Sequence, residues 1–185
     1  MVNTKQSLFK IALKLGSIAI AVYVVSSLIF LSFNLYESVY RIRETIGDAI
    51  YMIALLSAIV IAVRFYKKLN DGFLKITQAI KIGLIVAIVM AVGVILYNYI
   101  FINLLNPDYY TNYYYGTTGE QAWLDYYNLD PDTHTKESYD VHVKEAVLRE
   151  YQSYPILILT SIFMGLIISF IAGLLLKNEM KTDKK

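Results

Sequence analysis

Long stretches without a charged residue are the feature that most restricts how this chain can fold. Three such runs cover residues 15–36, 82–107 and 151–176, with 22, 26 and 26 positions. An apolar run of about 18 or more residues is typical of a membrane span, because about 20 helical residues cross a hydrocarbon layer of roughly 30 Å. We therefore expect the chain to cross a membrane several times.

A fourth, shorter run needs its flanks to reach that length. Residues 49–63 give only 15 uncharged positions between Asp48 and Arg64, a length that also suits a buried helix of a soluble protein. Uncharged neighbours extend the run on both sides, and Arg64 can place its guanidinium among the headgroups while its stem stays in lipid. We expect four spans in all, at residues 11–33, 46–66, 82–105 and 156–176.

These spans predict the fold class. Each must be helical, because lipid offers no hydrogen-bond partner to a free backbone amide, and no segment alternates as the strand of a barrel does. We expect an all-α integral membrane four-helix bundle with a partly helical, tyrosine-rich extracytoplasmic segment between spans 3 and 4. The expected organisation is spans 1–3 within residues 1–105, the outer segment at 106–155, and span 4 with a basic tail at 156–185.

The distribution of basic residues predicts the orientation of the spans. Twelve Lys and Arg residues fall in the N-terminal segment, the hairpin at 64–81 and the C-terminal tail, whereas five fall on the other side with twelve of the fifteen carboxylates. Cytoplasmic loops of membrane proteins are enriched in Lys and Arg, so we expect both termini in the cytoplasm. The basic hairpin is interpreted as a topology determinant that contacts lipid headgroups, not as a nucleic-acid site.

The hairpin also contains a turn and a resemblance to a known family. Asn70, Asp71 and Gly72 favour a chain reversal, because Asn and Asp promote turns and Gly permits positive φ, and we expect the next helix to carry Phe73. Together with QAIKIG at 78–83 and NPD at 106–108, this turn resembles the bacterial domain-of-unknown-function family 4199. The resemblance implies a four-span protein of the bacterial inner membrane and no assigned activity.

Small residues recur at four-residue intervals on three spans, a pattern that lets helix backbones approach closely in lipid. The candidate packing positions are Gly83, Ala87 and Ala91 on span 3, Gly165, Ser169 and Gly173 on span 4, and Ala54, Ala58 and Ala62 on span 2. We expect these stripes to pack within the bundle. Contact with a second copy or with another membrane protein is the alternative.

Aromatic residues are concentrated just beyond the third span. The candidate partner surface consists of Tyr109, Tyr110, Tyr113, Tyr114, Tyr115 and Trp123. An interfacial aromatic belt explains the tyrosines, since each has an apolar body and a polar tip; a platform for a protein or glycan partner is the alternative. Further along, the sequence predicts a helix at about 135–153, separated from span 4 by Pro155.

No set of residues indicates chemistry. The spans contain no Asp, Glu, Arg or His near mid-membrane, where an ionisable group would suggest proton or ion transfer. One stretch of acidic residues and histidines lacks the spacing of a zinc or EF-hand site, so we interpret it as a solvated acidic face. It contains Asp130, Asp132, His134, Glu137, Asp140 and His142. We expect no catalytic residue, no metal site, no cofactor and no nucleic-acid partner.

Three functions remain, and we order them by the features that favour them. A structural or accessory subunit of a membrane complex agrees best with the lack of chemistry. The alternative is a small oligomeric transporter or channel, in which Asn98 and Asn103 would line a polar path, and a membrane enzyme ranks last. The expected partners are the lipid bilayer and either another membrane protein or further copies of this chain.

Overall fold

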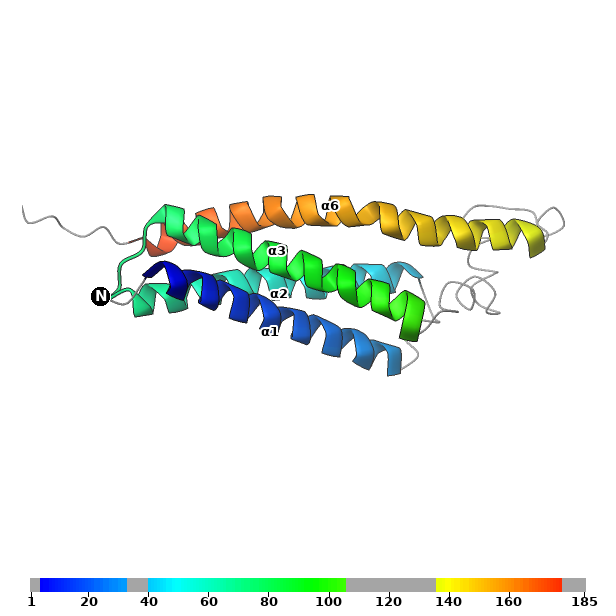
Figure 1. Ribbon diagram of the computed structural model, residues 1–185, viewed down its shortest axis with the longest axis horizontal. Coiled ribbons are helices and arrows are strands. Elements are labelled where there is room, and N and C mark those ends of the chain that lie inside the picture. Colours follow the sequence, from blue (N-terminus) through cyan, green and yellow to red (C-terminus); the bar gives the residue numbers. More distant parts are fainter. Residues whose placement is uncertain (1–3, 33–39, 106–135, 178–185) are drawn as a thin grey trace, which may run out of the picture.

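The computed structural model describes residues 4–32, 40–105 and 136–177, which form four long antiparallel helices (Figure 1). Helix α1 covers Thr4–Ser32, α2 Tyr40–Leu69, α3 Ile76–Ile100 and α6 Lys136–Leu176, and the π-helix η1 continues α3 through Phe101–Leu105. The predicted all-α four-helix membrane bundle is confirmed. Residues 106–135, which include the tyrosine-rich part of the predicted outer segment, lie outside the described residues.

All four helices are long and apolar enough to cross a membrane. The candidate spans are Leu8–Ile29, Ile46–Leu69, Ile76–Leu105 and Val147–Leu176. Large apolar side chains cover the outside of the bundle, including Leu159 and Leu175, which are 67% and 79% exposed. Such a surface suits lipid rather than water, and the chain is a multi-pass membrane protein.

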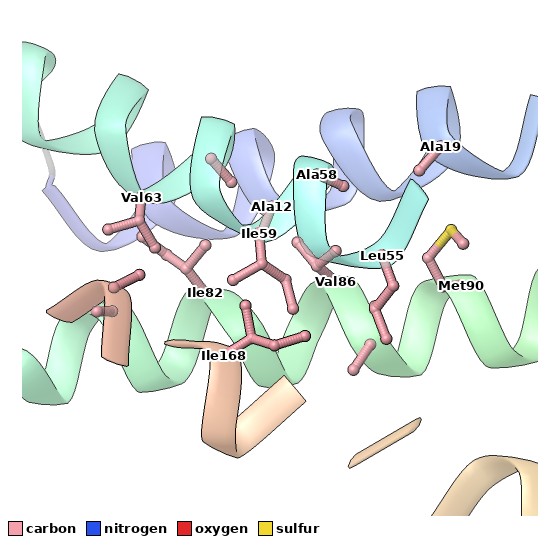
Figure 2. Packing of buried hydrophobic residues seen from close by; sticks show 14 of the residues in the cluster. Ala12, Ala19, Leu55, Ala58, Ile59, Val63, Ile82, Val86, Met90 and Ile168 are labelled. Atoms are coloured by element: carbon pink, nitrogen blue, oxygen red, sulfur yellow. The ribbon is translucent and has the colours of Figure 1, made fainter. Parts of the chain in front are cut away.

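Helix α3 lies at the centre of the bundle. It packs against α6, α1 and α2, while α1 and α6 also pack against α2. Figure 2 shows side chains of all four helices pointing into one apolar interior, among them Leu55, Ile59, Val86 and Ile168. Because lipid is as apolar as these side chains, close contact rather than expulsion from water is what favours this packing.

The turn between α2 and α3 has the structure that its sequence predicts. Asp71 and Gly72 adopt positive φ values of 51° and 81°, and the side-chain amide of Asn70 donates a 2.8 Å hydrogen bond to the carbonyl oxygen of Phe73. Phe73 itself precedes the helix, because the chain stays extended until Lys75, whose amide donates to Gln78 Oε1. Helix α3 therefore begins at Ile76, six residues before the span expected from charge alone.

Helix α6 differs most from the prediction. It runs without a break for 41 residues and contains Pro155, whereas the sequence predicted a separate outer helix that ends before this proline. Proline removes one backbone donor and its ring crowds the preceding turn, but in membrane proteins neighbouring helices hold such a helix together. Figure 1 shows that α6 consequently extends well past the ends of the other helices.

The two ends of the bundle differ in charge. The start of α1, the end of α6 and the α2–α3 turn lie together at one end (Figure 1). We call this the basic end, because its described residues include Lys10, Lys14, Arg64, Lys67, Lys68, Lys75, Lys81 and Lys177. The far end carries the projecting part of α6.

Candidate functional site

Helices α3 and α6 approach each other closely at their glycines. A Cβ built on Gly83 would overlap the side chain of Ser169 and lie 2.7 Å from the carbonyl oxygen of Gly165. A Cβ on Gly165 would lie 2.6 Å from the Cβ of Ala87 and 3.0 Å from the carbonyl oxygen of Gly83. Two backbones can approach this closely only where glycine removes the side chain between them.

This contact, the α3–α6 seam, uses most of the predicted packing positions. It consists of Ala79, Gly83 and Ala87 on α3 and of Gly165, Ser169 and Gly173 on α6. Ala91, the remaining position of the predicted α3 stripe, is fully buried, and the alanines of the α2 stripe are buried, with exposures of 9% or less. The stripes therefore face the interior of this bundle.

A second seam, between α1 and α3, escaped the sequence analysis. A Cβ on Gly16 would lie 2.9 Å from Cγ1 of Val89, and one on Gly93 would overlap the side chain of Ile20. The available signal was weak: Gly16 follows Ala12 by four residues, but Gly93 has no small residue four positions away. Since both seams lie on α3, this helix is held on two sides.

Tyrosines and serines link the four helices in the half of the bundle nearer the far end. Tyr51 on α2 forms a 2.6 Å hydrogen bond with Ser161 on α6, and the Tyr97 hydroxyl on α3 donates a 2.9 Å bond to Ser27 Oγ on α1. The ring of Tyr23 lies between these pairs, with its centroid 6.2 Å from that of Tyr51 and 6.0 Å from that of Tyr97, both edge to face. We call these five residues the tyrosine cluster.

The chemistry of the tyrosine cluster is that of a structural link. Its groups are neutral hydroxyls and rings, and the two hydrogen bonds, Tyr51 with Ser161 and Tyr97 with Ser27, each join two different helices. The sequence analysis did not identify this set of side chains. A period-3.6 pattern shows which face of a helix is buried, not which side chain lies opposite.

At the far end, α3 is bound to α6 through polar side chains. Asn98 Nδ2 donates a 3.3 Å hydrogen bond to Glu150 Oε1, and Asn103 Nδ2, within η1, donates a 3.0 Å bond to the Tyr151 hydroxyl. Asn98 and Asn103 are the two residues that a polar path would have used. In this structure they attach α3 to the projecting helix instead.

The other predicted site residues cannot be placed. Tyr109, Tyr110, Tyr113, Tyr114, Tyr115 and Trp123 lie outside the described residues, as do Asp130, Asp132 and His134. Within residues 4–32, 40–105 and 136–177, no three His, Cys, Asp or Glu side chains come together as a metal site. The expectations of no catalytic residue and no cofactor stay predictions.

Comparison with known proteins gives one match. A family model described as "Protein of unknown function (DUF4199)" matches residues 12–178, which extend from the first turns of α1 past the end of α6. No curated protein and no solved structure matches the chain. The resemblance inferred from the hairpin is thereby confirmed over nearly the whole length, and the matching description assigns no activity.

Proposed function

We propose, from the premise that this chain belongs to the DUF4199 family of proteins of unknown function, that it is an accessory subunit of a membrane complex. In this proposal the bundle anchors α6, and the part of α6 outside the membrane binds another membrane protein. The supporting observation is the length of α6 together with the side chains that its projecting part exposes.

Helix α6 is about twice as long as a span requires. Its 41 residues extend about 60 Å at 1.5 Å per residue, while about 20 residues cross the hydrocarbon layer. The candidate span Val147–Leu176 has 30 residues, more than the hydrocarbon layer requires, and counting about 20 residues back from Leu176 places the hydrocarbon boundary near residue 156. We call residues 136–154 the outer arm.

The outer arm has one face attached to α3 and exposes apolar side chains elsewhere on its surface. Glu150 and Tyr151 bond to Asn98 and Asn103, whereas Val141 and Leu148 are 50% and 57% exposed. Positions seven apart lie on the same side of a helix, so these two side chains form a short apolar stripe. An exposed apolar stripe on a helix held at a fixed angle is a common recognition surface for a partner protein.

The interior of the bundle supports a structural role over transport. Among the described residues, the buried polar ones are Ser161 and Ser169, and the two seams bring α3 into direct contact with α1 and α6. A transported ion or polar solute needs a hydrated or charged path through the membrane. No specific observation among the described residues therefore favours the oligomeric transporter alternative.

Photo-crosslinking tests the proposed partner contact. Leu148 and Leu159 lie eleven residues, or about three turns, apart on the same face of α6, and both are exposed. A photoreactive residue at position 148 should give a discrete adduct in native membranes, and the matched variant at 159 should not. The adduct, identified by mass spectrometry, should disappear in Val141→Asp. Adducts that contain only this chain, or equal adduct patterns at 148 and 159, would contradict the proposal.

We further propose that the basic end faces the cytoplasm of a bacterial cell and that the outer arm lies on the opposite side of the inner membrane. The excess of Lys and Arg at the basic end supports this orientation. The chain has no cysteine, so single-cysteine variants report directly. A membrane-impermeant maleimide should label Lys144→Cys in spheroplasts and Lys68→Cys only after lysis. The reverse pattern would refute the orientation.

A further inference from the structure

A groove between α2 and α6 opens on the surface of the bundle near the basic end. It has a volume of about 190 Å³, and Leu56, Val60, Arg64, Ile168, Ile171, Ala172, Leu175 and Leu176 line it. Seven of these eight side chains are apolar. We propose that the groove binds one acyl chain of an anionic phospholipid, whose phosphate pairs with Arg64.

The length and direction of the groove suit an acyl chain. Leu56 and Arg64 lie eight residues apart on α2, which corresponds to about 12 Å along the helix. One leaflet of the hydrocarbon layer is about 15 Å thick. Arg64 lies at the basic end of the groove, and Leu56 lies toward the middle of the membrane. A lipid in that leaflet would therefore place its tail along Val60 and Leu56 and its headgroup at Arg64.

The small side chain of Ala172 helps to form the hollow. Ala172 is 6% exposed and lies between Ile168 and Leu176 on the α6 side of the groove. The α3–α6 seam runs along the neighbouring face of the same helix, through Ser169 and Gly173. Because the seam holds α6 against α3, α6 cannot move toward α2 to fill the groove.

Charge complementarity identifies the headgroup. Arg64 lies five residues before the end of α2. It forms no ion pair or hydrogen bond within the described part of the chain. A cation inside a membrane span is costly unless it reaches an anion or water. The guanidinium group suits phosphate because it can donate two parallel hydrogen bonds to it.

Two further cations lie at the mouth of the groove. Lys68 follows Arg64 by one helical turn, and Lys177 directly follows Leu176 across the groove. Both are exposed, and neither forms an ion pair with another described residue. Three positive charges around one apolar groove favour an anionic lipid over a zwitterionic one.

Native mass spectrometry of the full-length protein in detergent tests this proposal, with phosphatidylglycerol and phosphatidylcholine of equal chain length as probes. We expect wild type to bind one phosphatidylglycerol about tenfold more tightly than phosphatidylcholine, because the choline group adds a positive charge that the three cations disfavour. Arg64→Ala should weaken binding of both lipids by about tenfold, since both carry the phosphate that Arg64 pairs with. Lys14→Ala is the matched control, because Lys14 is an exposed cation of α1 at the same end of the bundle that does not line the groove.

A second variant tests the acyl-chain part of the site without changing charge. Val60→Phe fills the groove and keeps Arg64, so it should weaken binding of both lipids while far-UV circular dichroism stays that of wild type. Equal effects of Arg64→Ala and Lys14→Ala would overturn the proposal in favour of a diffuse basic surface. It would equally be overturned if Val60→Phe left lipid binding unchanged, or if a second copy of the chain occupied the groove.

Discussion

Substitution of Gly83 by alanine tests the α3–α6 seam, where an added side chain would meet the backbone of the partner helix. The added Cβ would overlap Ser169 and lie 2.7 Å from the carbonyl oxygen of Gly165. A rotation of the Ser169 side chain cannot relieve the contact with the Gly165 carbonyl oxygen, because that oxygen belongs to the backbone of α6. The two helices must therefore separate.

The size of the effect follows from these distances. Ordinary van der Waals contact begins near 3.4 Å, so α6 must move by at least about 0.7 Å to relieve the contact with the Gly165 oxygen, and further to relieve the closer contact with the Ser169 Cβ. Overpacking of this kind costs about 1–3 kcal/mol, and the higher helix propensity of alanine offsets up to about 1 kcal/mol of it. We expect the free energy of unfolding to fall by about 1–2 kcal/mol.

The assay is reversible unfolding by dodecyl sulfate in mixed micelles, followed by far-UV circular dichroism. The matched control is Gly47→Ala on α2, because a Cβ at Gly47 has no neighbour within 4 Å. This control should be neutral or stabilised by up to about 1 kcal/mol. If Gly83→Ala and Gly47→Ala had the same stability, the seam would not be as close as described. Adding Ser169→Gly to Gly83→Ala should restore part of the loss, since it removes two of the three nearest contacts.

Three further substitutions test other parts of the bundle by the same unfolding measurement. Tyr51→Phe removes the hydrogen bond to Ser161 and should cost about 0.5–2 kcal/mol, with no additional loss when Ser161→Ala is combined with it. Gly72→Ala places a side chain at a φ of 81° and should cost about 1 kcal/mol; an unchanged stability would show that the turn adopts another conformation. Pro155→Ala supplies the backbone donor that proline lacks inside α6 and should stabilise the protein by about 1–3 kcal/mol, whereas a loss of stability would show that the proline itself favours the native conformation of α6.

The number of spans could be predicted because hydropathy accumulates over a window of residues. Each uncharged run exceeds or nearly reaches the length that a membrane span requires. This length does not depend on which helices pack against the run. The ends of the spans were less certain. The third span begins at Ile76 instead of residue 82, because Lys81 is exposed on the helix surface and does not interrupt the helix.

The partners of each helix face could not be predicted in the same way. The sequence indicated that Gly83 and Gly165 favour close packing, yet it could not show that they lie opposite each other. It gave even less indication that Gly93 accommodates Ile20, since that contact joins a single glycine to a large side chain. Such pairs depend on the angle and register between two helices, which many side chains determine together.

The sequence by itself determined the four apolar segments, the unequal charges of the two ends, the reversal at Asn70–Gly72 and the stripes of small residues. Each of these depends on residues that are neighbours along the chain or along one helix. Only the tertiary structure decided that α3 is the central helix, that α6 continues through Pro155 into an outer arm, and that α2 and α6 leave a groove beside Arg64. These features depend on contacts between helices, because the side chains of all four helices together determine the distance between any two backbones.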